Sequence, residues 1–319
     1  MGEYNKAAII KYARREKGMT QEELAEGICD PVTLSRYENG QIDPTEERFV
    51  RLMQKLGVKS DRYIFPIECE SAEIEKIMVE ILYFIEKKDW KSAEKFLNII
   101  KNKYSISMEY CENRQYCKRI EVIINYNKGI IDEEEAIKEL EEALSYTYDG
   151  DIWNEFIASR IYRETEILIL FNMATLYSLI GDEKKALSVY QNLDNYFMRS
   201  DILNNNKPRY LVYVGYTNLL GKIKEYDKAI RICWREIKWL KRNNKVNYLY
   251  NFYYNIGWCM KKKIDEGLEE KKGILIAKIY VWVSYWLCYK YPENENNLRK
   301  IEKFYRELCR EDMGTERII

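Results

Sequence analysis

The hydrophobic pattern of the chain is helical along its length. Apolar residues recur at intervals of three and four, no strand-like alternation persists, and the 319 residues include only five prolines. In the first sixty residues this pattern predicts a helix over residues 5–17, ended by Gly18, and a further short helix that begins after Thr45. We therefore predict an all-α fold.

Between these two helices, the stretch Thr20–Gly40 predicts two short helices joined by a tight turn. Thr20 and Glu23 have the spacing of a capping box at the start of the first helix. Asp30 and Pro31 begin the second helix, because Asp caps a helix and Pro suits its first turn. Such a pair forms the helix-turn-helix whose second helix enters the major groove of DNA. The alternative is a structural helical hairpin without a role in DNA binding.

From about residue 71 onward, the pattern predicts helical pairs that repeat. A tetratricopeptide (TPR) unit needs small residues where its two helices cross. Four alanines mark such crossings at intervals of 43, 50 and 43 residues: Ala93, Ala136, Ala186 and Ala229. These intervals exceed the roughly 34 residues of regular TPR units, which predicts longer helices or loops. A last crossing is expected at Gly257, with final helices near 273–290 and 296–310. A non-repetitive helical bundle is the alternative.

These patterns predict a helix-turn-helix domain over residues 1–62, a linker over 63–71 and a helical-repeat domain over 72–319. Phe65-Pro66 is a plausible boundary, because the residue before a proline disfavours helix.

The charge balance gives DNA binding no general support. The chain has 52 basic and 52 acidic residues, and its first 58 residues contain nine Lys and Arg against ten Asp and Glu. Any DNA contact must therefore use local patches. One such cluster lies at the end of the first helix and consists of Lys11, Arg14, Arg15 and Lys17.

The composition argues against an enzyme. The chain has no histidine, which excludes Ser-His-Asp and Cys-His catalysis and all His-containing metal sites. Its eight cysteines form no CxxC pair, and the nearest two are Cys111 and Cys117. With no signal-peptide pattern and no run of 18 apolar residues, we expect a cytoplasmic protein with reduced thiols, no membrane segment, no metal and no cofactor.

Four short segments carry a resemblance to known families. The segments MTQEEL, TLSRYENG and KLGV, the last at residues 55–58, resemble the Cro/repressor-type helix-turn-helix. The segment ELAEGIC with its shortened following turn resembles the peptide-responsive Gram-positive regulators of the Rgg and PlcR type. This resemblance implies a helix-turn-helix followed by a right-handed TPR-like α-solenoid. In the family that array binds a short linear signalling peptide and dimerises.

The candidate DNA contacts lie on and beside the second helix of the pair. They are Gln21, Val32, Thr33, Ser35, Arg36 and Asn39. Arg36 can pair with guanine, and the methyl groups of Thr33 or Val32 can touch a thymine methyl group, although Val32 can also face the core. Gln21 and Asn39 occupy helix-end positions that contact phosphate in similar domains.

The candidate peptide contacts lie on the first helix of each repeat pair, which lines the concave groove. They are Asn125, Asn172, Tyr213, Asn218, Asn251 and Asn255. An asparagine amide offers both a donor and an acceptor, so a row of them can clamp a peptide backbone, as similar asparagines do in the family. Side-chain pockets are expected from Tyr213, Tyr216, Tyr254 and Trp258. The alternative is that a chain this rich in Asn, Lys, Ile and Tyr places asparagines there by chance.

Together, the motifs and the resemblance predict a transcription regulator of the quorum-sensing type, gated by a short peptide. Its expected partners are double-stranded DNA with an inverted-repeat operator, the peptide and a second copy of the chain, because one small domain reads only a half-site. Two alternatives remain. One is a TPR scaffold that tethers a folded protein partner to DNA. The other is an enzyme, such as the phosphatase-like activity of related TPR sensors, which the absence of histidine opposes.

Overall fold

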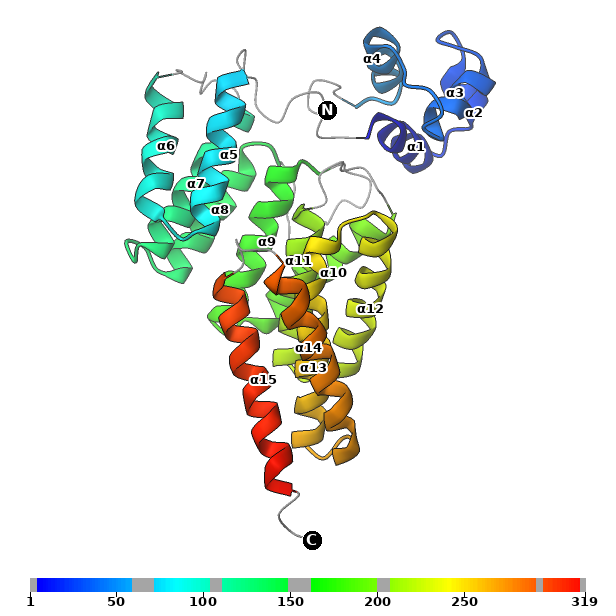
Figure 1. Ribbon diagram of the computed structural model, residues 1–319. Helices are drawn as coiled ribbons and strands as arrows, with labels where there is room; N and C mark the ends of the chain where they lie inside the picture. Colours follow the sequence, from blue (N-terminus) through cyan, green and yellow to red (C-terminus); the bar gives the residue numbers. More distant parts are fainter. Residues whose placement is uncertain are drawn as a thin grey trace. The chain divides into compact units, whose positions relative to one another are not determined.

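The computed structural model describes residues 5–58, 72–103, 111–148, 162–199, 207–290 and 295–315 (Figure 1). Every regular element in these ranges is a helix, which confirms the all-α prediction. The chain divides into two compact units, Met1–Arg209 and Tyr210–Ile319. The proposed linker over 63–71, with Phe65-Pro66, lies outside the described residues, so the predicted domain boundary stays a prediction.

The helix-turn-helix segment contains four short helices, α1 (Lys6–Glu16), α2 (Gln21–Ala25), α3 (Pro31–Glu38) and α4 (Glu46–Lys55). Each begins at a side chain that accepts a backbone N–H of the first turn, namely Asn5, Thr20, Asp30 and Thr45. The capping box at Thr20 is complete, because the Glu23 carboxylate also accepts the backbone N–H of Thr20 at 2.7 Å. The predicted helix starts are therefore confirmed.

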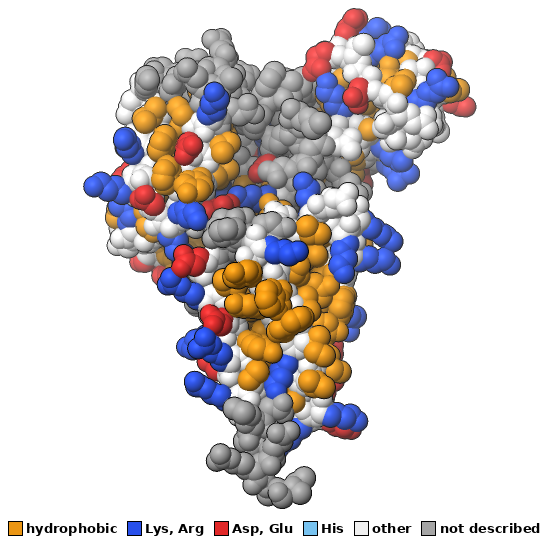
Figure 2. Space-filling model, viewed as in Figure 1, with side chains coloured by type: hydrophobic (Ala, Val, Ile, Leu, Met, Phe, Trp, Pro, Cys, Tyr) orange, Lys and Arg blue, Asp and Glu red, His pale blue; other side chains and the backbone are white. Residues whose placement is uncertain are grey.

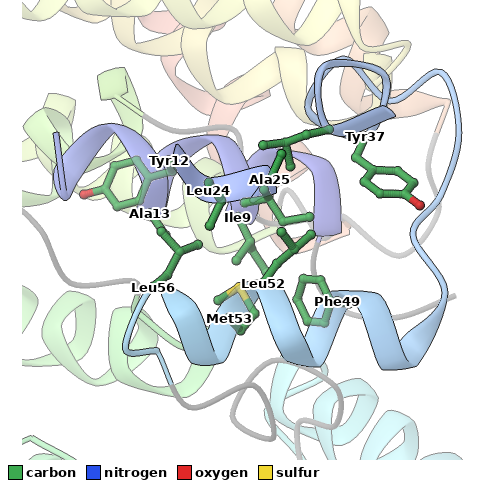
Figure 3. Packing of buried hydrophobic residues seen from close by; sticks show 12 residues of the cluster. Ile9, Tyr12, Ala13, Leu24, Ala25, Tyr37, Phe49, Leu52, Met53 and Leu56 are labelled. Atoms are coloured by element: carbon green, nitrogen blue, oxygen red, sulfur yellow. The ribbon is translucent and has the colours of Figure 1, made fainter. Parts of the chain in front are cut away.

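A small hydrophobic core holds these four helices together (Figure 3). Ile9 from α1, Leu24 from α2 and Leu34 from α3 meet Leu52 and its neighbours on α4, and all four leucine and isoleucine side chains are fully buried. Because each helix buries only one face here, its opposite face is left to solvent. This arrangement fixes which residues of α3 are exposed.

The remainder of the first unit is a series of helical pairs. Its helices are α5 (Ala72–Glu86), α6 (Trp90–Lys103), α7 (Cys111–Asn127), α8 (Glu133–Ser145), α9 (Glu164–Leu179) and α10 (Glu183–Arg199). Each of them packs against the next, and α7 also contacts α9. The predicted crossing residues Ala93, Ala136 and Ala186 are completely buried. Neighbour-on-neighbour packing with small residues at the crossings is typical of a helical-repeat array.

The second unit continues the same organisation. It begins within α11 (Lys207–Lys222) and contains α12 (Tyr226–Arg242), α13 (Leu249–Asp265), α14 (Ile274–Tyr289) and α15 (Glu295–Thr315). The final two helices agree with the predicted ranges, except that α15 extends further. The predicted crossing residue Ala229 is completely buried, and Thr217 and Cys233 are buried as well.

Helices α13 and α14 approach each other closely at Gly257. A Cβ atom at this position would lie 2.6 Å from Cγ2 of Val281 and 2.9 Å from the backbone oxygen of Ala277. Real Cβ atoms do not approach other heavy atoms this closely, so only glycine allows the two helices to meet here. The predicted crossing at Gly257 is confirmed.

We expect Gly257→Ala to destabilise the chain by about 1–3 kcal/mol, the usual cost of overpacking a core, even though alanine favours helix. The measurement is the midpoint of thermal unfolding followed by circular dichroism. Gly273→Ala serves as the control, because a Cβ there would approach no atom closer than 3.4 Å. Equal midpoints for the two variants would contradict the close-packing argument.

Candidate nucleic-acid interface and ligand-binding surface

The outward face of α3 is open to solvent. Leu34 and Tyr37 are buried, which turns Val32 and Arg36 outward, and the side chain of Val32 is 62% exposed. The expectation that Val32 can face the core is therefore wrong, and its candidacy as a base contact stays a prediction. The side chain of Arg36 makes no hydrogen bond or ion pair with any described residue, so its guanidinium donors are all available.

Other candidate residues beside Arg36 already have partners. The hydroxyl and backbone N–H of Thr33 both donate to the Asp30 carboxylate, which lowers the pKa of Asp30. The Thr33 hydroxyl therefore has no hydrogen left to donate to a base, but its oxygen can still accept a hydrogen bond and its methyl group can still make contact. The Asn39 amide accepts a long hydrogen bond of 3.4 Å from Lys11 and donates one of 3.5 Å to Ser35. These weak bonds leave Asn39 and Ser35 able to rearrange at a DNA surface.

A buried carboxylate, Glu38, links α1, α2 and α3. Arg14 donates to both of its oxygens, from Nε at 2.6 Å and Nη2 at 2.8 Å, and also to the backbone oxygen of Met19. Gln21 adds a third bond to Glu38 at 2.7 Å. Burial opposes ionisation of Glu38, but the bonds from Arg14 and Gln21 outweigh it and hold the pKa of Glu38 below its usual value.

This network corrects part of the sequence analysis. Arg14 was counted in a basic cluster for DNA, but its guanidinium is committed to Glu38 and Met19. Lys11, Arg15 and Lys17 remain as the cationic side chains of that cluster. The amide nitrogen of Gln21 donates one of its two hydrogens to Glu38, so the predicted phosphate contact depends on the second hydrogen. Nothing in the residue pattern signalled that Glu38 would be buried.

Basic side chains of α4 hold the turn between α2 and α3. Arg51 donates to the backbone oxygen of Gly27 at 2.7 Å, and Lys55 donates to that of Glu26 at 2.8 Å. Gly27 adopts the left-handed backbone conformation, with φ of 76°, which glycine allows without strain. Arg48 fixes the far end of α3 through the Tyr37 hydroxyl at 2.8 Å. Helix α3 is therefore anchored at both ends within the protein itself.

In the first unit, the two candidate groove asparagines lie on α7 and α9. Both Asn125 and Asn172 are half-buried. The Asn172 oxygen accepts a hydrogen bond of 3.1 Å from Nε of Arg119, and burial lowers the pKa of Arg119 to about 10. This bond leaves the amide nitrogen of Asn172 as a donor. The Asn125 side chain has no partner among the described residues.

In the second unit, the candidate positions lie on α11 and α13. Asn218 is exposed and has no side-chain partner among the described residues. Asn251 donates to the Tyr210 hydroxyl, and the buried Asn255 donates to the Thr217 hydroxyl at 2.8 Å. Tyr213 is fully buried. Its position offers a ligand no surface, and its role as a peptide contact stays a prediction that the geometry does not support.

A hollow of about 370 Å³ opens between α13 and α15. Its aromatic walls are Tyr254, Trp258 and Phe304, and its polar lining includes Lys261, Lys262, Lys300, Lys303, Asp265 and Glu307. The Lys300 ammonium lies 5.1 Å from the ring centroid of Tyr254. Burial, with a smaller effect of Glu307, raises the pKa of Tyr254 to about 12, so its hydroxyl remains a donor. Of the four aromatic residues expected to form pockets, Tyr254 and Trp258 line this one, whereas Tyr216 is buried.

The described part of the chain shows neither a membrane helix nor a metal cluster. None of its helices is long and apolar enough to cross a bilayer. No three of its Cys, Asp and Glu side chains are grouped as metal ligands. The seven cysteines within the described ranges are free thiols, four of them buried.

Comparisons with known proteins bear separately on the helix-turn-helix segment and on the fold of the whole chain. Residues 10–63 match a family model described as helix-turn-helix. Among solved structures, PlcR of Bacillus thuringiensis in complex with the peptide PapR7 and DNA aligns over 95% of this chain and 98% of its own, at 18% identity and a TM-score of 0.55. Its apo form aligns over 92% and 98%, at 16% identity and a TM-score of 0.56.

A second protein shares the fold. ComR from S. thermophilus, in complex with DNA and its signalling peptide ComS, aligns over 95% of this chain and 99% of its own, at 13% identity and a TM-score of 0.55. No curated protein sequence matches the chain significantly. At these identities the likeness establishes the arrangement of helices: a helix-turn-helix followed by a TPR-like helical array.

The Glu38 network generates a prediction about acid stability. The folded pKa of Glu38 lies below its unfolded value of 4.5, so its contribution to stability is full well above pH 4.5 and is lost as the pH falls through the folded pKa. At pH 7 we expect Glu38→Gln to cost roughly 1–3 kcal/mol, the value of hydrogen bonds to a charged group. The difference between parent and variant should shrink in acid.

Urea unfolding at several pH values measures this difference. The control is Glu16→Gln, which removes an exposed carboxylate at the end of α1. A Glu38→Gln variant as stable as the parent at pH 7 would show that the network adds no stability.

Proposed function

We propose that this chain is a DNA-binding transcription regulator, controlled by a short linear peptide that its helical-repeat part binds. It acts as a homodimer in the cytoplasm. The main support is an anchored α3 with an unengaged Arg36 on its open face, in a domain that matches the helix-turn-helix family. The fold it shares with PlcR and ComR adds to this, since both have been solved with DNA and a peptide.

In this proposal α3 enters the major groove and reads bases through its open face. Arg36 pairs with a guanine, and the methyl groups of Val32 and Thr33 contact thymine. Ser35 and Asn39 are weakly held and adjust to the backbone. Because one such domain reads a half-site, the operator is an inverted repeat.

The phosphate contacts come from side chains that form few or no strong hydrogen bonds within the protein. Lys11 reaches only a long bond to Asn39, and both Arg15 and Lys17 are exposed. Gln21 contributes through the part of its amide that Glu38 does not use. Each cation that neutralises a phosphate adds to the salt dependence of binding.

Each asparagine can contact the peptide through the amide donor or acceptor that it does not use within the protein. Asn172 donates its amide nitrogen, since its oxygen is used by Arg119. Asn251 donates within the protein and offers its oxygen to a peptide N–H group. Asn255 is 7% exposed and donates to Thr217, so a peptide reaches at most the edge of its amide. Asn125 and Asn218 can use both the amide nitrogen and the amide oxygen, since neither bonds to a described residue. The hollow beside Tyr254 and Trp258 suits a side chain that is aromatic or negatively charged.

No catalytic step is part of the proposal, because the chain has no histidine for the commonest catalytic arrangements. A peptide can shift the regulator between two states only by the difference in its affinity for them. The scaffold alternative would be favoured by a pull-down that recovers a folded protein instead of a peptide.

We expect Arg36→Ala to weaken binding to the cognate operator by about 1–3 kcal/mol, the value of a bidentate base contact, and to leave binding to random DNA nearly unchanged. The contrast is Arg15→Ala, which should weaken both DNAs alike and reduce the salt dependence. Fluorescence anisotropy on footprinted operator DNA measures both. An unchanged preference for the operator in Arg36→Ala would remove Arg36 as a base reader.

We expect Asn218→Ala to lower peptide affinity about three- to tenfold, because a hydrogen bond contributes roughly 0.5–1.5 kcal/mol net. Its stability should not change, since Asn218 is exposed. Calorimetry with a synthetic copy of an exported peptide encoded beside this gene is the measurement. Asn243→Ala is the control, because this asparagine is exposed at the end of α12 and donates to Trp239. Equal affinities for both variants and the parent would count against the asparagine clamp.

A further inference from the structure

One buried cation of the helical-repeat part has no anionic partner. Figure 2 shows basic and acidic side chains mixed over the visible surface, where water solvates them. Arg119 on α7 is different, because it is only 7% exposed and no carboxylate among the described residues forms an ion pair with it. A buried charge is costly unless it is paired and hydrogen-bonded. Arg119 therefore requires an anion that the described part of the chain does not supply.

Most hydrogen-bond donors of the Arg119 guanidinium are unused. Its Nε donates to the side-chain oxygen of Asn172 at 3.1 Å, which links α7 to α9. The N–H groups of Nη1 and Nη2 have no partner among the described residues. These two nitrogens belong to the fork that binds a carboxylate through parallel hydrogen bonds, so the part of the guanidinium suited to an acid is the part left open.

The polar groups beside Arg119 are donors as well. The oxygen of Asn172 is occupied by Arg119, so its amide nitrogen is the group that can bind a ligand. The Tyr116 hydroxyl, three residues before Arg119 on α7, is buried and has no hydrogen-bond partner. Burial raises the pKa of Tyr116 more than the Arg119 charge lowers it, so the hydroxyl keeps its proton. We call Tyr116, Arg119 and Asn172 the Arg119 site.

The acids and bases around the Arg119 site set the charge that it can accept. Glu164, at the start of α9, favours the charged form of Arg119, but burial outweighs it and lowers the pKa of Arg119 to about 10. The neighbouring cation Lys118 is used elsewhere, since its Nζ lies 3.5 Å from Glu139 and 3.4 Å from Glu142. A single positive charge, partly offset by Glu164, suits a singly charged carboxylate better than a doubly charged phosphate.

Another buried arginine shows how this fold otherwise neutralises such a charge. Arg163 is 4% exposed, and its Nη1 lies 2.9 Å from the carboxylate of Glu112. The described chain thus provides an acid for Arg163 and none for Arg119. Asn172 is half-buried, so the Arg119 site can be reached from the surface through this side chain. An acid from outside the protein can therefore take the place that Glu112 takes at Arg163.

We propose that the Arg119 site binds a carboxylate of the peptide ligand, which accepts hydrogen bonds from the open guanidinium nitrogens, the Asn172 amide and the Tyr116 hydroxyl. The proposal rests on the proposed function, since it takes the ligand to be a peptide. The carboxylate belongs either to an Asp or Glu side chain or to the C-terminus. Because α7 and α9 both contribute donors, the bound carboxylate bridges the first helices of adjacent pairs. A peptide without it leaves a buried charge unpaired, so the site selects acidic peptides.

Affinity selection on the full chain, from a synthetic pool of short random peptides, tests the proposal. The pool is made once with free C-termini and once with C-terminal amides, and mass spectrometry identifies what is retained. The best-bound peptide is then compared by calorimetry with its neutral analogue, in which Asn, Gln or a terminal amide replaces the acid. We expect the neutral analogue to bind about ten- to a hundredfold more weakly, the value of hydrogen bonds to a charged group. The analogue that loses affinity shows which carboxylate is bound.

Variants then assign this preference to Arg119. Arg119→Met should bind the acidic peptide and its neutral analogue equally, and Arg119→Lys should keep part of the preference, because it retains the charge without the fork. Lys118→Met is the control, since it removes a neighbouring charge that is already paired and should keep the full preference. Circular dichroism and thermal unfolding check that each variant folds. If Arg119→Met does not fold, the parent and Arg119→Lys still decide the question.

The outcomes separate this inference from the proposed function. Equal affinity of the parent for both peptides, or a folded Arg119→Met chain that still prefers the acid, would overturn the inference and leave peptide control intact. A parent that retains no peptide would remove peptide control, and sodium acetate then becomes the probe. Acetate that raises the thermal midpoint of the parent above equimolar chloride, but not that of Arg119→Met, would uphold the carboxylate site. Equal effects on both chains would overturn it.

Discussion

The geometry of the helix-turn-helix depends on one buried carboxylate. Glu38 is 4% exposed and receives hydrogen bonds from Arg14 on α1 and Gln21 on α2, so three helices meet at a single charge. A buried charge is tolerated only when it is paired and hydrogen-bonded, and this pairing restricts how α3 can rotate. The face of α3 that carries Arg36 is directed outward as a consequence.

The helical-repeat part depends on a different constraint, the close approach of helices at small residues. Ala93, Ala136 and Ala186 are completely buried where helices cross, and Gly257 lets α13 and α14 approach until no Cβ would fit. Interiors are packed as densely as organic crystals, so such positions define the crossing points.

The two candidate sites differ in which polar side chains are already hydrogen-bonded within the protein. In the helix-turn-helix segment, several basic side chains near α3 are hydrogen-bonded within the protein. Arg14 bonds to Glu38, and both Arg51 and Lys55 bond to the turn that precedes α3. Along the repeats, Asn172 and Asn255 each connect two first helices of adjacent pairs. A ligand there would meet amides that are already oriented, which lowers the entropic cost of binding.

The sequence by itself determined the local elements, since helix caps at Thr20 and Asp30 and small residues at crossings act through neighbours in the chain or through a repeated spacing. Only the tertiary structure decided which side chains were used internally. Glu38 carries no signal in the hydrophobic pattern, and only the fold brings Arg14 of α1 against it. Tyr213 was predicted to line the groove, but packing buries it. Burial and pairing of a polar side chain depend on residues distant in sequence, and periodicity carries no information about those partners.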